Sequence, residues 1–277
     1  MTRNGLARAG VLITCFVAGI GSASAQPPKL SPRKGFVFHD QRQVDRFVVQ
    51  RWVSETSPEV SASGICECIT VVYEGDRKIL TLGPDEGSID VASSGKDITG
   101  DGRAELVVRT NSGGAHCCES TSIYSIEGAP REILSVATGS CPGELVDLDK
   151  DGVPEFKTCD DTFANAMCSF AYSPMPNVVF AYDKAKRRYA VATPRYLIAA
   201  EEAKAAVAEA RKAMQENPQD VDIRRCGALA PALSLIYGGR VDEGLALFRL
   251  LYKRPDAPQV ERKTMELVRK SPLWIPK

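Results

Sequence analysis

Two stretches of the chain repeat one another: residues 97–118 read DITGDGRAELVVRTNSGGAHCC and residues 147–168 read DLDKDGVPEFKTCDDTFANAMC. The second follows the first at an offset of fifty residues and aligns without a gap. The matching pairs are Asp97 with Asp147, Asp101 with Asp151, Gly102 with Gly152, Glu105 with Glu155, and Cys118 with Cys168. Internal repetition at this period is typical of blades or of other stacked supersecondary units.

Three pairs of β-branched and aromatic runs accompany the repeat, and each pair flanks a short polar turn. The paired runs are 69–73 with 78–82, 122–126 with 132–136, and 178–182 with 189–192. Such runs around short turns predict β-hairpins. Strand-like residues also follow each acidic stretch, at 106–108 and 156–158. We therefore expect residues 36–195 to form one mainly antiparallel β domain of repeated strand–loop–hairpin units, with two full repeats and partial ends.

The composition changes after Tyr196, where alanine, glutamate and lysine become frequent. Helical spacing of apolar residues and the positions of the prolines predict four helices. Their expected bounds are 197–216, 220–237 with a kink at Pro231, 240–254 and 258–270. The predicted fold class is thus α+β: a β domain that is partly propeller-like or a sandwich, followed by an α-helical region at 196–277. The short Gly238-Gly239 turn makes this tail similar to helical-hairpin (TPR-like) repeats.

The first 25 residues are typical of a cleavable signal peptide. Arg3 and Arg8 precede an apolar run at 11–20, VLITCFVAGI, and Ala23-Ser24-Ala25 provides a small-x-small cleavage pattern. A run this short does not span a bilayer, which needs ~20 apolar residues. An uncleaved anchor and a lipoprotein modified at Cys15 are the alternatives. We expect cleavage before Gln26, a linker at 26–35, and a secreted or periplasmic protein.

The charge balance argues against some partners. The chain has 35 basic and 35 acidic residues, so loss of the two arginines in the signal peptide leaves a net charge of −2. A near-neutral chain offers no electrostatic attraction for nucleic acid or for a membrane surface. No integral membrane span is expected after signal cleavage. A protein partner, bound through the helical tail or the β domain, is the expected kind of interaction.

Cysteine usage agrees with export, because disulfides form in oxidising compartments. The mature chain has an even set of candidates: Cys66, Cys68, Cys117, Cys118, Cys141, Cys159, Cys168 and Cys226. Zinc ligation is the alternative, but the paired CxxC or Cys/His spacings of zinc sites are missing. Cys141 and Cys159 flank the second acidic stretch and are placed to join its two arms. Cys118 and Cys168 occupy equivalent repeat positions, so we expect each to pair with a neighbouring repeat and not with the other.

The acidic stretches have the ligand spacing of a calcium loop. Calcium takes six to eight oxygen ligands, and a short loop supplies them from alternate positions. Position 6 is glycine in both stretches, which permits a left-handed turn. Positions 1, 3, 5 and 9 provide the candidate ligands: Asp97, Thr99, Asp101 and Glu105 in the first loop, and Asp147, Asp149, Asp151 and Glu155 in the second. With a neutral threonine and an extra glycine, the first loop is expected to bind more weakly. An acidic surface turn without an ion is the alternative.

The pattern D-x-[D/T]-x-D-G-x-x-E leading into a strand resembles the FG-GAP/VCBS-type repeats of integrin-α-like proteins. The resemblance covers the two loops and their flanking strands, residues 65–195, and implies calcium as the bound ion at the eight positions above. The chain departs from that family in having too few repeats to close a propeller, in lacking its usual Phe-Gly and Gly-Ala-Pro signatures, and in its many cysteines.

Residues 113–118, GGAHCC, are open to three interpretations. Adjacent Cys117 and Cys118 form a reducible redox site in the first. His116 with Glu119 forms a metal or acid–base site in the second. In the third, the two cysteines point to opposite faces of a strand and pair with different partners.

Known catalytic motifs are missing: the sequence contains no Gly-x-Ser-x-Gly, no His-Glu-x-x-His and no phosphate-binding glycine-rich motif. We therefore expect an exported, non-catalytic calcium-binding structural or interaction protein. The alternative is an exported enzyme, either a hydrolase that uses clustered acids or a thiol–disulfide oxidoreductase at Cys117-Cys118. An interaction scaffold built on the helical tail is the third hypothesis.

Overall fold

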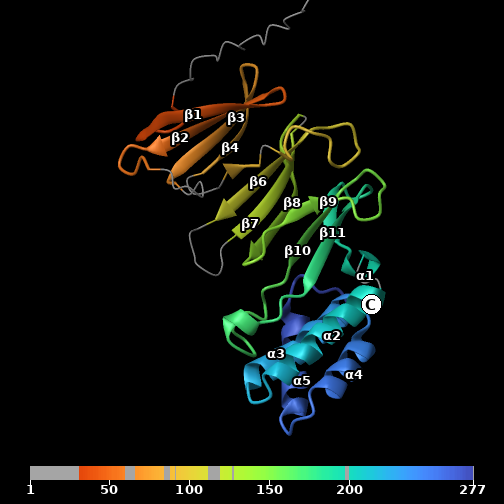
Figure 1. The fold of residues 1–277 in the computed structure, drawn as a ribbon. Coiled ribbons are helices and arrows are strands. Elements are labelled where there is room, and N and C mark those ends of the chain that lie inside the picture. The colour runs from red at the N-terminus through yellow and green to blue at the C-terminus, as the bar shows by residue number, and fades with distance from the viewer. Residues whose placement is uncertain are drawn as a thin grey trace, which may run out of the picture.

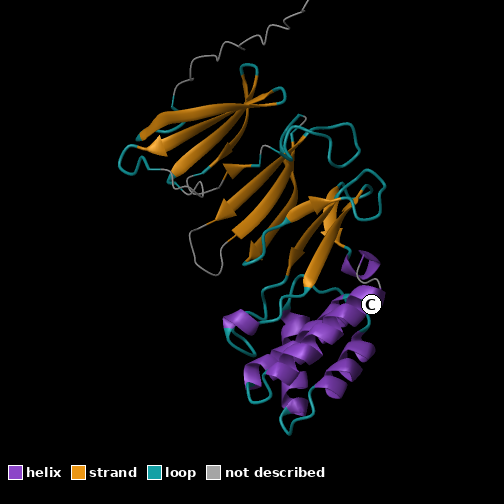
Figure 2. Cartoon of the chain, in the orientation of Figure 1, coloured by secondary structure: helices purple, strands orange, loops and turns teal. Residues whose placement is uncertain are grey.

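The structure, a computed structural model, describes residues 31–59, 66–83, 88–90, 92–111, 119–126, 128–196 and 200–276. The signal peptide, the proposed cleavage site and residues 113–118 lie outside these ranges. Three small antiparallel sheets follow one another through the molecule, and a helical region lies beyond the third (Figures 1 and 2). The predicted α+β class is confirmed. The described sheets form neither a closed barrel nor a closed propeller.

Each sheet has four strands. Sheet 1 contains β1 (Phe36–Val44), β2 (Phe47–Ser54), β3 (Cys68–Glu74) and β4 (Arg77–Leu82). Sheet 2 contains β5 (Ser88–Ile89), β6 (Glu105–Asn111), β7 (Glu119–Ser125) and β8 (Arg131–Gly139). Sheet 3 contains β9 (Glu144–Val146), β10 (Glu155–Cys159), β11 (Asn177–Asp183) and β12 (Arg188–Val191). In every sheet, strands that are consecutive in sequence are hydrogen-bonded neighbours.

The predicted hairpins are the last two strands of each sheet, and the acidic stretches join the first two strands of sheets 2 and 3. Sheet 1 departs from the expected partial end, because it is a complete four-stranded unit. Its first two strands are joined by a tight turn at Asp45-Arg46, where Asp45 has a φ of 52°. This turn stands where sheets 2 and 3 have an acidic loop. The repeat seen in the sequence is a repeat of those loops, so it did not reveal sheet 1 as a complete unit.

Alternation of side chains along the strands lets the sheets stack face to face. On β6, Leu106 and Val108 join an apolar cluster shared with sheet 1, whereas Val107 joins a cluster shared with sheet 3. The second cluster continues through Phe156 and Phe180 into the helical region. Sheet 2 is therefore buried on both faces, and one core runs from sheet 2 to the last helix.

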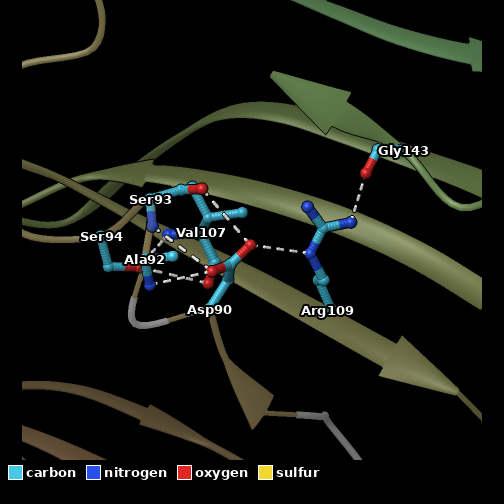
Figure 3. A network of polar contacts seen from close by, with 7 residues as sticks. All are labelled: Asp90, Ala92, Ser93, Ser94, Val107, Arg109 and Gly143. Carbon is cyan, nitrogen blue, oxygen red and sulfur yellow. Dashed lines mark hydrogen bonds and ion pairs between the residues drawn. The ribbon is translucent and has the colours of Figure 1, made fainter. Parts of the chain in front are cut away.

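A polar network also joins sheet 2 to sheet 3 (Figure 3). Asp90, next to β5, accepts hydrogen bonds from the backbone N–H groups of Ala92 and Ser93 and from the Arg109 Nε at 3.0 Å. Arg109 also donates to the carbonyl of Gly143, which directly precedes β9. The Arg109 guanidinium holds the pKa of Asp90 below its usual value, although burial opposes this effect. One charged pair thus fixes a turn of sheet 2 and the start of sheet 3.

The helical region begins with the one-turn helix α1 (Thr193–Tyr196). Four longer helices follow: α2 (Ala200–Glu216), α3 (Val221–Tyr237), α4 (Val241–Leu251) and α5 (Ala257–Lys270). They match the four predicted helices, and α3 continues through Pro231. A Cβ on Gly244 would lie 2.6 Å from the Ala232 carbonyl oxygen, so only glycine lets α4 approach α3 this closely. Within the described residues, no helix has both the length and the apolar character needed to cross a membrane.

A buried carboxylate connects the helices to sheet 3. Asp160 follows β10 and is 2% exposed, and its Oδ2 accepts hydrogen bonds from the Tyr237 hydroxyl at the end of α3 and from the Ser271 hydroxyl after α5. Its Oδ1 accepts the backbone N–H of Thr162 at 2.9 Å. A buried carboxylate is stable only when it is well hydrogen-bonded. The network therefore sets where two helix ends meet the β region.

Three disulfides link described cysteines: Cys66 with Cys68, Cys141 with Cys159, and Cys168 with Cys226. The second joins the two arms that flank the second acidic loop, as the sequence predicts. The third ties the β10–β11 connection to α3, so the expectation that Cys168 pairs with a neighbouring repeat is wrong: packing of the tail on sheet 3 brings Cys226 of α3 to it. Because disulfides form in oxidising compartments, these pairs are consistent with a protein that works outside the cytoplasm.

Replacing Tyr237 by phenylalanine removes one donor from the buried Asp160 carboxylate. We expect Tyr237→Phe to lower the free energy of unfolding by about 1–3 kcal/mol, the usual effect of an unsatisfied buried group. Urea denaturation measures the change, and Tyr172→Phe is the control because Tyr172 is exposed. Equal stabilities of the two variants would contradict the role of the network.

The disulfides close loops of very different length, with sequence separations of 58 for Cys168–Cys226 and 2 for Cys66–Cys68. In the chain-entropy description a longer loop constrains the unfolded state more, by about 4 kcal/mol against about 1.5 kcal/mol here. The double variant Cys168→Ser/Cys226→Ser should therefore lose more stability in denaturant unfolding than Cys66→Ser/Cys68→Ser. The reverse order would show that native-state contacts, and not loop closure, dominate.

Candidate metal centre

The second acidic loop, residues 147–155, joins β9 to β10 and is closed by its own first aspartate. Asp147 accepts the backbone N–H of Asp151 at 3.1 Å and that of Gly152 at 3.0 Å. Asp151 in turn accepts the N–H of Val153 at 2.8 Å. Gly152 has a φ of 87°, the left-handed conformation expected from its glycine. These bonds wrap the loop around its carboxylates.

The first loop, residues 97–105, joins β5 to β6, repeats these three bonds and adds a fourth, from the Gly100 N–H to Asp97 at 2.7 Å. Asp97 accepts the N–H groups of Asp101 at 3.2 Å and Gly102 at 2.8 Å, and Asp101 accepts that of Arg103 at 3.1 Å. Gly102 has a φ of 82°. The offset of fifty residues in the sequence therefore corresponds to two loops with one backbone conformation.

The glutamates at position 9 are the first residues of β6 and β10, and both are buried. Glu105 Oε2 accepts the N–H of Ile98 at 2.9 Å, and Glu155 Oε2 accepts the N–H of Leu148 at 2.8 Å. Each glutamate thus holds position 2 of its loop against the start of a strand. This support role was not part of the sequence prediction, which assigned both glutamates as ligands.

The three aspartates of the second loop come together at the surface. The carboxylate oxygens of Asp147, Asp149 and Asp151 lie within 4.8 Å of one another, close enough to hold a metal ion. Glu155 is not part of this group. Across the described residues, no other set of three or more histidines, cysteines or acids has this geometry. The described residues therefore give no support to the interpretation of the cysteines as zinc ligands.

In the first loop, two oxygen atoms of predicted metal ligands are buried. Thr99 Oγ1 and Glu105 Oε1 are fully buried and make no hydrogen bond of normal geometry, although the Tyr182 hydroxyl lies near Thr99 and the Thr99 N–H lies near Glu105. Burial, reinforced by the charges of Asp101 and Asp97, raises the pKa of Glu105 from 4.5 to about 7, against the hydrogen bond from Ile98. Unpaired buried oxygens cost free energy unless a donor or a cation satisfies them. Both atoms belong to predicted ligands.

The two loops lie side by side at the same end of sheets 2 and 3 (Figure 1). A Cβ on Gly100 would lie 3.0 Å from Val153 Cγ2, so the loops are in contact. Tyr189 on β12 donates to the Pro154 carbonyl at 3.0 Å, and burial together with the charges of Glu105 and Glu155 raises its pKa. Sheet stacking therefore turns two separate sequence motifs into one paired site.

A tyrosine and an arginine approach each loop. In the first loop, Asp101 Oδ2 lies 3.4 Å from the Tyr182 hydroxyl and 4.0 Å from Arg187 Nη2. In the second, Asp149 Oδ2 lies 3.1 Å from the Tyr196 hydroxyl and 2.9 Å from Arg195 Nη2. These four residues were not predicted. The pattern Tyr-x₆-Tyr-x₆-Tyr at 182, 189 and 196 marks the two tyrosines in the sequence but not the two arginines.

The redox and acid–base hypotheses for His116, Cys117 and Cys118 lie outside the described residues. Glu119, the first residue of β7, is described and accepts a hydrogen bond from the Asn111 amide at 3.4 Å. The hypothesis of an enzyme active site at residues 113–118 therefore stays untested.

Comparison of the chain with known protein families, with curated proteins and with solved structures finds no match. The likeness to FG-GAP/VCBS-type repeats thus stays a prediction from the two loops.

The raised pKa of Glu105 predicts how stability depends on pH in the presence of a chelator. Because the folded state holds this proton up to about pH 7, the stabilisation is complete below pH 4.5 and is lost as the pH rises to about 7. A tenfold change in proton affinity corresponds to about 1.4 kcal/mol, so the loss is roughly 3 kcal/mol.

The measurement is urea unfolding at pH 5 and at pH 8. Glu105→Gln should lose less stability than the wild type between these pH values, whereas Glu132→Gln, an exposed carboxylate on β8, should keep the wild-type loss. Identical pH dependence in all three proteins would contradict the assignment.

Proposed function

We propose that this is an exported, non-catalytic calcium-binding protein in which paired loops stabilise the β region, leaving the helical tail to contact a protein partner. The observation that carries the proposal is that both predicted calcium loops adopt one hydrogen-bonded frame, so their spacing reflects a shared backbone conformation. An accidental acidic turn would have no reason to recur with the same bonds.

The ligand chemistry supports a divalent cation at each loop. Three exposed carboxylates converge in the second loop, and their mutual repulsion is relieved by a bound positive charge. In the first loop, the buried Thr99 Oγ1 and Glu105 Oε1 are oxygen donors that a cation would satisfy. All these donors are oxygens, which hard cations prefer, and flexible loops of oxygen ligands suit calcium better than magnesium.

The proposed export of the protein and its proposed partner surface are inferred from separate features. The signal-peptide pattern at residues 1–25 supports export, and the three disulfides fit an oxidising compartment. Calcium is abundant outside cells, where modules with dissociation constants of ~10⁻⁴–10⁻³ M are occupied. The tail is proposed as the partner surface because it lies outside the β region that the loops stabilise.

Thermal unfolding with and without calcium tests the proposal. Calcium at about 100 times its dissociation constant should stabilise the mature protein by about 2.7 kcal/mol over the chelated form. Asp151→Asn should remove part of this gain, because it deletes a charge of the triad but keeps an oxygen for the Val153 N–H. The control is Glu144→Gln, an exposed carboxylate on neighbouring β9.

The thermal unfolding experiment has three outcomes that decide the calcium proposal. A calcium-dependent rise that Asp151→Asn reduces and Glu144→Gln leaves intact supports the proposal. An unchanged midpoint on chelation in all three proteins overturns it. A rise that neither variant affects would assign calcium elsewhere and overturn the second loop as a site.

A further inference from the structure

The second loop receives two hydrogen bonds from outside the β region, and both reach the same atom. Arg195 Nη2 and the Tyr196 hydroxyl donate to Asp149 Oδ2 at 2.9 Å and 3.1 Å. Both residues belong to α1, the turn of helix that separates sheet 3 from the four long helices. The position-3 carboxylate of the loop therefore serves as the contact between the loop and the first helix of the tail.

The aspartates of the triad differ in what holds them. Asp147 and Asp151 accept backbone N–H groups of their own loop, and these bonds leave their oxygens free to share a cation. In the described part of the chain, the hydrogen bonds that Asp149 accepts come from α1 alone. The Arg195 guanidinium is thus a positive charge paired with one of the three carboxylates of the triad, and it also lies 5.0 Å from the centre of the Tyr196 ring.

The two ends of α1 are anchored differently. Thr193 is 1% exposed, and its hydroxyl accepts the N–H of Val179 on β11 at 3.1 Å. The Arg195 side chain, by contrast, is 67% exposed. An exposed ion pair contributes little to stability, so this contact breaks easily while Thr193 stays fixed. The first residue of α1 is therefore fixed to β11, whereas Arg195 near its end is held by an exposed ion pair and the Tyr196 hydroxyl also interacts with Glu155.

We propose that Arg195 and Tyr196 form an internal clamp on Asp149, and that a divalent cation bound to the second loop displaces it. A cation needs the Asp149 carboxylate and repels a guanidinium held within a few ångströms. Loading the loop therefore frees the end of α1 and changes how the helical region joins sheet 3. This inference rests on the proposed calcium function of the same loop.

The first loop has no such contact with α1 among the described residues. Its Asp101 faces Tyr182 and Arg187, which belong to sheet 3 and its β11–β12 turn, at the longer distances of 3.4 Å and 4.0 Å. A cation there would rearrange side chains within the β region and leave α1 in place. The clamp is therefore specific to the loop that lies next to the helical tail.

Calcium titration of the mature protein by isothermal calorimetry, after removal of metal with a chelator, provides the test. Arg195→Gln removes the competing charge and should raise the calcium affinity of the second loop about two- to fivefold, as expected for an exposed ion pair. Arg211→Gln on α2 makes the same change in net charge away from the loops and should leave the affinity at the wild-type value.

Hydrogen exchange at residues 193–196 provides the second readout. Calcium should speed exchange there in the wild type, whereas Arg195→Gln should exchange fast with or without calcium. The Arg195 backbone N–H bonds the Ala192 carbonyl at 2.9 Å, so its protection reports directly on the helical turn.

The outcomes separate the clamp from the calcium proposal. Equal calcium affinities in wild type and Arg195→Gln, with unchanged exchange, overturn the clamp and leave calcium binding intact. Binding in Arg195→Gln but not in the wild type supports the clamp in its strongest form. No binding by either protein overturns both proposals.

Discussion

The central sheet of this protein, sheet 2, has two apolar faces, and neither is stable in contact with water. An apolar sheet face must pack against another layer to leave water, so stability depends on stacking. Sheet 2 is covered by sheet 1 on one face and by sheet 3 on the other, as the alternation of Leu106, Val107 and Val108 between two clusters shows. The helices then extend the cluster that begins between sheets 2 and 3.

This stacking positions the loops. Each acidic loop leaves the first strand of its sheet and returns as the second, so stacked sheets place both loops at one end. The buried glutamates reinforce the arrangement, because Glu105 and Glu155 are the first residues of their strands and hold the loops through backbone N–H groups. Loop conformation is therefore coupled to the core. A bound ion would stabilise the adjoining β sheets as well as the nine residues of its own loop.

The junction between sheet 3 and the helices uses three kinds of interaction. Cys168–Cys226 is a covalent link, Asp160 is a buried polar link to Tyr237 and Ser271, and Arg195 with Asp149 is an exposed ionic link. The first two hold one side of the junction under all oxidising conditions. The third is weak and involves a predicted metal ligand, so it is the part of the junction that an ion can change.

The sequence by itself determined the local structure of this protein. Strand runs, turns, helix bounds and the repeated loop depend on neighbours within a few residues. The pattern at 97–118 and 147–168 predicted the loops, the β-branched and aromatic runs predicted the hairpins, and the spacing of apolar residues after Tyr196 predicted the helical tail. The Cys141–Cys159 pair was also predictable, because the two cysteines flank the second acidic loop.

Only the tertiary structure decided which distant groups meet. Sheet 1 was not recognised as a full unit, because its Asp45-Arg46 turn lacks the acidic residues of the other loops. The burial of Glu105 and the approach of Arg195 to Asp149 arise from stacking of elements far apart in the chain. Residue spacing encodes backbone geometry within one element, whereas the burial and partners of a side chain depend on the faces that pack against it.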